Sequence, residues 1–290
     1  MLAEEEPLDF MSFYLIENMN DNKIISDINN LIIEELTVNN EQITLARQIF
    51  AKLNEIYNSE QFFEVDGYRI LQKMFTCPFF GKELSVIFNL YDYDNKKVLE
   101  QYKQQHRITS NYNDDKNCIV IGIKSIKKQF NKNLIYNKIS HELTHAMQNT
   151  LNNKSNNAIT KNYKLSTKNY NSNNPIIRAI SSIFYLCDKH EIESFGNGLY
   201  AELEEQMNEN GLIKFEETDT YRKLERLKKS LNIIKENKDN VEQAMISSFN
   251  SQIAYKRLVN IGEIGYKKML VKCGKIIVKF TKDYDKYVRF

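Results

Sequence analysis

The chain has 290 residues, of which 42% are apolar, 11% aromatic and 27% charged. These values are typical of a folded globular protein and exclude a disordered one. Forty Lys and Arg against thirty-eight Asp and Glu give a formal charge of +2, which excludes the strongly basic character of a dedicated nucleic-acid-binding protein.

The amino terminus and the cysteines carry no signal for export or disulfide pairing. The first ten residues are acidic where a secretory signal needs positive charge, and no apolar run approaches the roughly 18 residues that span a bilayer. We therefore expect a soluble protein with neither a membrane nor a nucleic acid as partner. Four scattered cysteines are predicted to be reduced and buried, namely Cys77, Cys118, Cys187 and Cys273.

The first part of the chain is predicted to be helical and then to form strands. Apolar residues recur at helical spacing from residue 8 to about residue 58. In residues 83–92 every second residue is apolar, namely Leu84, Val86, Phe88 and Leu90. Residues 118–123 are rich in β-branched residues. Both segments are predicted strands of a small sheet, and the polar residues 111–117 are the predicted turn before the second strand.

The rest of the chain is predicted to be mostly helical. Residues 131–151 and 219–290 have helical periodicity, and Pro175 stands where the first turn of a helix favours proline. Residues 152–174 contain nine Asn and almost nothing to bury, which is typical of an insertion loop.

These patterns predict an α+β fold, mostly helical, with a small twisted sheet before the helix at 131–151. We expect three regions. A helical N-terminal leader covers residues 1–60, a core with the insertion loop covers residues 61–210, and a helical C-terminal region covers residues 211–290.

One motif in the predicted helix carries metal chemistry. Residues 140–146 read Ser-His-Glu-Leu-Thr-His-Ala, which matches the HExxH pattern. Histidines four residues apart leave the same face of a helix, so His141 and His145 can bind one zinc ion. Glu142 lies about 100° round the helix from His141, where it can act as a general base. Apolar residues line the opposite face, namely Ile135, Ile139, Leu143, Ala146 and Met147. The alternative is that both histidines are ordinary core or surface residues.

Zinc needs a third protein ligand and a fourth position left for water. The metzincin continuation of the motif requires Gly and His where the chain has Gln148 and Leu151, so that class is excluded. A carboxylate from a following helix is the other common solution, and Glu191 and Glu193 both lie on such a helix. His190 is a further alternative, as a ligand or as a transition-state donor.

The motif and the later glutamate resemble the gluzincin, or thermolysin-like, metallopeptidases, and also the minimal zincins of phages and bacteria. The resemblance covers about residues 132–205. It implies that His141 and His145 are zinc ligands, that Glu191 is the third ligand, and that Glu142 is the catalytic base.

The chain departs from the family pattern at Ser194, where Ala is usual, and at Phe195, where Asp or Asn often stands. These departures keep Glu193 as an alternative ligand. Family members also use a downstream His or Tyr to stabilise the oxyanion, but this chain has no His after His190. The candidates for that role are Tyr185, Tyr200, Tyr255, Arg257 and Tyr266.

The resemblance implies a zinc-dependent metallohydrolase, and more narrowly a metalloendopeptidase that cleaves peptide bonds with a zinc-activated water. Its substrate is expected to be a peptide or protein, and its location the cytoplasm or a virion. The alternative is a structural or interaction protein, such as a phage particle component, that keeps the zincin fold without turnover.

Overall fold

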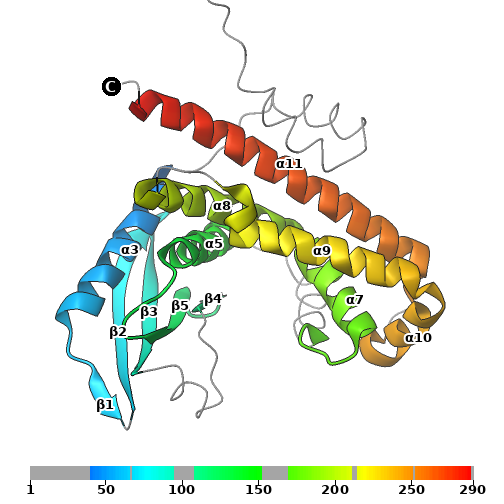
Figure 1. Ribbon diagram of the computed structural model, residues 1–290, viewed down its shortest axis with the longest axis horizontal. Coiled ribbons are helices and arrows are strands. Elements are labelled where there is room, and N and C mark those ends of the chain that lie inside the picture. The colour runs from blue at the N-terminus through cyan, green and yellow to red at the C-terminus, as the bar shows by residue number, and fades with distance from the viewer. Residues whose placement is uncertain are drawn as a thin grey trace, which may run out of the picture. The chain divides into compact units, whose positions relative to one another are not determined.

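The computed structural model describes residues 40–65, 67–94, 108–151, 169–210, 214–250 and 252–288. Within these residues the fold is α+β, with one five-stranded sheet and a mostly helical remainder (Figure 1). The chain divides into two compact units. Among the described residues, the sheet unit comprises those from 40 to 151 and from 193 to 222, and the helical unit comprises those from 169 to 192 and from 223 to 288. Two divisions fall inside continuous helices, one in α8 (Lys189–Asn210) and one in α9 (Asp219–Glu236).

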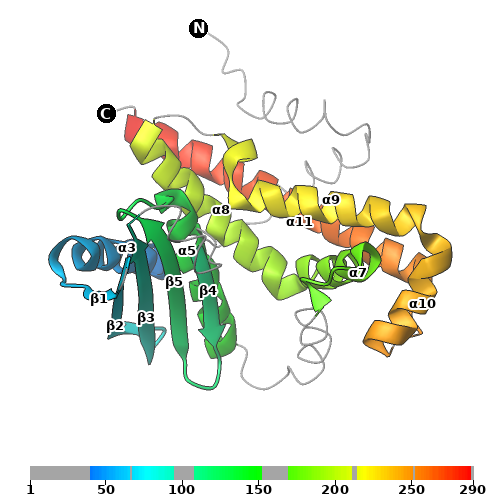
Figure 2. The same cartoon turned by 60° about the horizontal axis from the view of Figure 1, so that its bottom comes forward.

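The sheet has the strand order β1-β2-β3-β5-β4 (Figure 2). The strands are β1 (Phe63–Val65), β2 (Tyr68–Phe79), β3 (Lys82–Tyr93), β4 (Ile108–Asn113) and β5 (Cys118–Ile126). β3 and β5 are parallel, and every other neighbouring pair is antiparallel. Among the described strands β4 therefore forms one edge of the sheet, and it runs opposite to β5.

A two-residue turn joins β2 to β3 and sets their register. Phe80 and Gly81 have φ angles of 47° and 72°, which is the left-handed conformation that a type I′ hairpin turn requires. Glycine adopts this conformation without steric cost. The strands then pair along their whole length, from Phe79 opposite Lys82 to Tyr68 opposite Tyr93.

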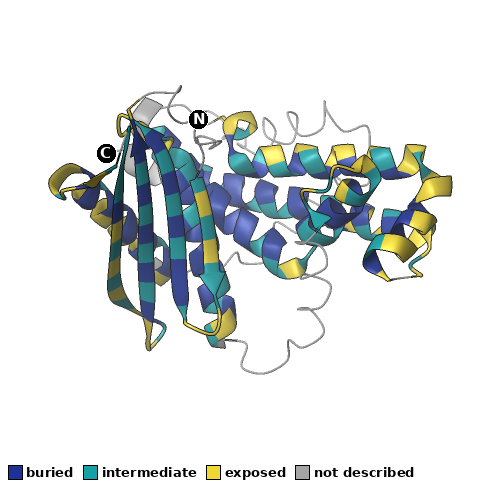
Figure 3. Cartoon of the chain, turned by 90° about the horizontal axis from the view of Figure 1, so that it is seen from below, coloured by how far each residue is buried: buried dark blue, intermediate teal, exposed yellow. Residues whose placement is uncertain are grey.

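The core of the sheet unit lies between one face of the sheet and two helices, α3 (Asn40–Ser59) and α5 (Lys132–Leu151). Buried residues alternate along β3, as its sequence pattern predicts, and also along β5, and Figure 3 shows this alternation along the strands. The fully buried apolar residues of these strands are Leu84, Val86, Phe88, Leu90, Ile119, Ile121 and Ile123. The core therefore fixes α5, with its motif, against the sheet.

The helical unit contains α7 (Pro175–Leu186), most of α9 (Asp219–Glu236), α10 (Lys238–Phe249) and α11 (Tyr255–Val288). A 3₁₀ turn, η1 (Phe215–Glu217), precedes α9. α7 begins at Pro175, as predicted, and the Asn174 side chain accepts hydrogen bonds from the backbone amides of Ile176 and Ile177. α7 and α11 approach so closely that a Cβ on Gly265 would lie 2.1 Å from Cys187 Sγ.

Three strands are missing from the sequence prediction. The predicted strands at 83–92 and 118–123 are confirmed within β3 and β5, but β1, β2 and β4 have no predicted counterpart. The prediction that residues 111–117 form a turn is wrong in its first part. Residues 111–113 end β4, and only residues 114–117 form the turn.

Other sequence predictions have mixed outcomes. All four cysteines are free, but Cys77 and Cys187 are only partly buried. No helix in the described part of the chain is long and apolar enough to cross a membrane. Most of the predicted leader and residues 152–168 of the predicted insertion loop lie outside the described residues. The boundaries of the three predicted regions stay a prediction.

Candidate metal centre

α5 carries both histidines of the motif and is anchored by its opposite face. Ile135, Ile139, Leu143 and Ala146 are fully buried in the core of the sheet unit. This apolar stripe holds one side of the helix against the sheet, so residues on the other side turn away from the core.

The two imidazole rings are arranged like ligands of one ion. Their Nε2 atoms lie 3.2 Å apart, and their ring centroids are 4.8 Å apart at an interplanar angle of 80°. Two nitrogens bound to one tetrahedral zinc at its usual bond length stand about 3.3 Å apart. The pair therefore fits a shared zinc ion without a change in the spacing of the rings.

Glu191 completes a group of three. α8 begins next to Asp188, whose Oδ1 accepts a hydrogen bond from the His190 amide, so Glu191 falls in the first turn of the helix. One ligand atom each from His141, His145 and Glu191 lie within 4.8 Å of one another, and Glu191 is only 2% exposed. Two imidazoles and a carboxylate are a donor set that zinc favours.

The other predicted ligands are not in this group. Neither Glu193 nor His190 belongs to the cluster that the described residues form. The Glu193 carboxylate instead accepts a hydrogen bond of 2.9 Å from Gln148 Nε2. Gln148 Oε1 in turn lies 3.1 Å from His145 Nδ1, and Ser194 Oγ lies 3.4 Å from the same nitrogen.

Phe195, which departs from the family pattern, packs against the first histidine. Its ring centroid lies 4.9 Å from that of His141 at an interplanar angle of 44°. Phe195 is 2% exposed, so its ring forms an apolar wall beside His141.

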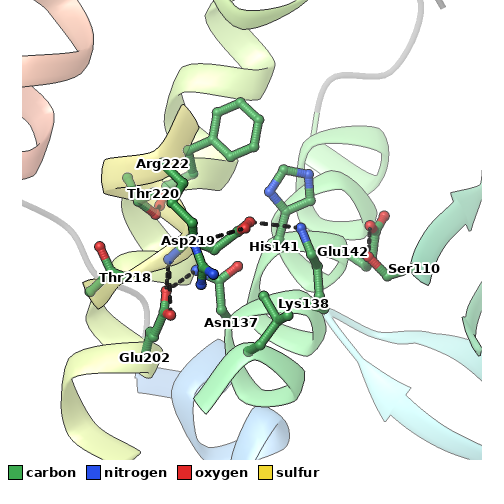
Figure 4. Close-up of polar contacts among 12 residues, drawn as sticks. Ser110, Asn137, Lys138, His141, Glu142, Glu202, Thr218, Asp219, Thr220 and Arg222 are labelled. Carbon is green, nitrogen blue, oxygen red and sulfur yellow. Dashed lines mark hydrogen bonds and ion pairs between the residues drawn. The ribbon is translucent and has the colours of Figure 1, made fainter. Parts of the chain in front are cut away.

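Glu142 is buried and points towards the edge strand β4 (Figure 4). Ser110 Oγ on β4 donates a hydrogen bond of 2.6 Å to Glu142 Oε1. Two residues further along the strand, Tyr112 accepts a hydrogen bond from Asn149 of α5. The motif helix is thus fastened to β4 at both residues.

Polar contacts also hold α5 against α8. Ser140 Oγ donates to the backbone oxygen of Asn197 at 3.1 Å, and Asn197 Nδ2 donates to Thr144 Oγ1 at 3.1 Å. Gln42 of α3 donates to the same Thr144 oxygen at 2.6 Å. Ser140 and Thr144 directly precede the two histidines on α5, so their contacts fix the α8 backbone beside the histidines.

A second polar cluster lies one turn before the motif (Figure 4). The Glu202 carboxylate accepts hydrogen bonds from Asn137 Nδ2 at 2.8 Å and from the Asp219 backbone amide at 2.9 Å. Asp219 also pairs with Lys138 at 3.0 Å. Burial raises the pKa of Glu202 to about 7, to which the nearby Asp219 charge adds, while the two hydrogen bonds and Arg222 act in the opposite direction.

This raised pKa predicts that stability falls as the pH rises. The folded protein holds the Glu202 proton more tightly than the unfolded chain does, so the stabilisation is complete below about pH 4.5 and is lost as the pH approaches 7. The difference amounts to about 3 kcal/mol. Urea unfolding of metal-free protein between pH 5 and 8 should show the decrease, and Glu202→Gln should remove it. The same slope in both proteins would contradict the assignment.

Two residues of the site escape prediction from sequence. Ser110 lies in a polar segment that gives no strand signal, and only the short alternation of Ile108, Ser110 and Tyr112 marks a face of β4. Gln148 stands three residues after His145, a spacing that brings two side chains together on one helix. That spacing is the signal that could have found it.

The predicted oxyanion donors stay predictions. The Tyr185 ring packs on Tyr170 with centroids 5.2 Å apart. Tyr200 is 8% exposed and lines a small hollow between α3, α5 and α8. Tyr255, Arg257 and Tyr266 all lie on α11 in the helical unit.

No protein-family model matches the chain, and neither a curated protein nor a solved structure matches it. The likeness to a zincin-like metal site therefore rests on the motif and on the grouped side chains of His141, His145 and Glu191.

Proposed function

We propose that the chain is a zinc metallopeptidase whose metal ligands are His141, His145 and Glu191. The observation that carries the proposal is the grouping of these three side chains, with the two Nε2 atoms 3.2 Å apart. Mg²⁺ and Ca²⁺ prefer shells made of oxygen atoms alone, whereas two imidazoles with one carboxylate suit zinc. Three protein ligands leave one coordination position for a water or a substrate, which is typical of a catalytic zinc site.

Glu142 is the proposed general base. Zinc held at this site supplies Lewis acidity and lowers the pKa of a water molecule in its open position. Ser110 donates to Oε1 of Glu142 and so limits the rotation of the carboxylate, while Oε2 is the atom proposed to take the proton. The same carboxyl then gives the proton to the leaving amine.

A peptide is the proposed substrate because an edge strand borders the site. Within the described residues β4 pairs only with β5, and Ser110 and Tyr112 of β4 contact α5. An extended peptide can add to such an edge through main-chain hydrogen bonds. A peptide on β4 would pass close to Glu142, because Ser110 joins the strand to this carboxylate.

A second candidate is a binding protein that keeps the metal site without turnover. The observation in its favour is the absence of any His after His190 in the sequence, since gluzincins commonly use a downstream His or Tyr on the oxyanion. Both candidates require the metal. Only the peptidase requires Glu142 as a base.

Metal analysis combined with a cleavage screen tests the proposal. Purified protein supplied with zinc should hold about one ion per chain. His141→Ala or His145→Ala should lose the ion, because the one remaining histidine cannot replace the pair. A proteome-derived peptide library should then be cleaved by the parent protein. Protein without stoichiometric zinc would exclude the metalloenzyme, and zinc without cleavage would favour the binding protein.

A further inference from the structure

Two further side chains, Gln148 and Glu193, are linked by hydrogen bonds to Nδ1 of His145, the ring nitrogen that faces away from His141. His145 Nδ1 lies 3.1 Å from Gln148 Oε1, one turn later on α5. Gln148 Nε2 donates to Glu193 Oε2 of α8 at 2.9 Å. Gln148 is only 8% exposed, so water competes little for its amide.

The chemistry of these groups decides which atom donates and which accepts in each of the two hydrogen bonds. A carboxylate can only accept a hydrogen bond, so Glu193 requires the NH₂ of Gln148 to face it. The amide oxygen of Gln148 must then face His145, and because an amide oxygen also only accepts, the hydrogen lies on His145 Nδ1. A neutral imidazole with its hydrogen on Nδ1 has its lone pair on Nε2.

We propose that Gln148 and Glu193 form a relay that positions His145 by fixing its tautomer and ring orientation. The relay presents the lone pair of His145 Nε2 to the metal position, on the side that faces His141 Nε2 at 3.2 Å. The inference rests on the proposed function, because it assigns the relay to the same metal site. Gln148 and Glu193 are positioning residues that act through His145.

The ring of His141 has a neighbour of a different kind. The apolar ring of Phe195 packs beside it. The relay of Gln148 and Glu193 therefore serves the second histidine of the motif.

Zinc affinity is the first readout. Loss of a partner that orients a ligand typically weakens metal binding about 10 to 100-fold. Gln148→Ala and Glu193→Gln should each have an effect of this size, measured by competition with a chelator. Glu193→Gln keeps the shape but can donate as well as accept, so it removes the fixed direction. Either change breaks the same relay, so the two losses should not add. The double variant of Gln148 and Glu193 should therefore have the same zinc affinity as whichever single variant binds zinc more weakly.

A second Gln–Glu pair on the same protein provides the matched control. Gln206, also on α8 and 5% exposed, donates to Glu217 Oε2 at 3.2 Å without contact to either histidine of the motif. Gln206→Ala and Glu217→Gln should leave zinc affinity within about twofold of the parent. Equal losses from the two pairs, or additive losses from Gln148 and Glu193, would overturn the relay.

The tautomer of His145 is a readout that needs no metal. Imidazole ¹H–¹⁵N correlation spectra of the metal-free parent, recorded where the ring is neutral, should show His145 with its hydrogen on Nδ1, and Gln148→Ala should give a mixture of tautomers. A parent protein that binds no zinc but keeps this tautomer would exclude the proposed function and retain the relay. A parent protein that binds zinc, but whose metal-free form has the hydrogen of His145 on Nε2, would overturn the relay and leave the proposed function standing.

Discussion

Glu142→Gln is expected to lose nearly all peptide hydrolysis while the fold and the zinc content stay unchanged. A positioned general base contributes about 10² to 10⁴-fold to a rate, and an amide cannot take a proton from water. The amide oxygen of the variant can still accept the hydrogen bond that Ser110 donates to Glu142 Oε1, so the contact between α5 and β4 should survive. The fall should therefore appear in kcat rather than in stability.

The experiment compares kcat on the best peptide from the cleavage screen, zinc content, and the thermal midpoint of unfolding. Glu83→Gln is the matched control, because it makes the same chemical change at an exposed position on β3. The control should keep the activity of the parent. A Glu142→Gln protein that cleaves peptides like the parent would show that another group is the base.

The motif helix could be predicted because its information is local. Helical spacing by itself places His141 and His145 on one face and the apolar stripe on the other, and α5 has both. β3 could be predicted for the same reason, since strict alternation requires only neighbouring residues. Local periodicity also put a glutamate on the following helix, and Glu191 is the one grouped with the histidines.

β2 could not be predicted because its pattern is mixed. Leu71, Met74 and Phe75 have helical spacing, and a proline within a strand usually argues against it. The sheet explains the proline. β1 pairs only with Tyr68–Ile70, so the part of β2 that holds Pro78 lies at the edge among the described strands, where a missing N–H costs little.

β4 and the contacts of the site depend on distant segments. The β4 sequence is polar and resembles a turn, and pairing with β5 makes it a strand. The bond from Ser110 to Glu142 spans 32 residues, and the bond from Gln148 to Glu193 spans 45. Such pairs form only when α5 packs on β4 and α8, so the sequence alone could name Glu193 but not its partner.

The third ligand offers the largest expected change in metal affinity after the histidines. Glu191→Ala removes a carboxylate whose oxygen lies with the two histidines inside a 4.8 Å group. We expect zinc binding to weaken by more than the roughly 100-fold that marks the upper range for a residue that only orients a ligand. Glu193→Ala should stay within or below that range, since its carboxylate contacts Gln148 rather than the group.

The geometry of α8 makes this comparison a matched one. Residues two apart on a helix point about 200° from each other, so Glu191 and Glu193 leave opposite sides of the same turn. The two substitutions remove the same atoms from the same helix, and only the position of the carboxylate differs. Competition with a chelator should therefore separate the two variants clearly. Equal and small losses would mean that Glu191 is not a ligand, and His190, in the same turn, would be the next residue to replace.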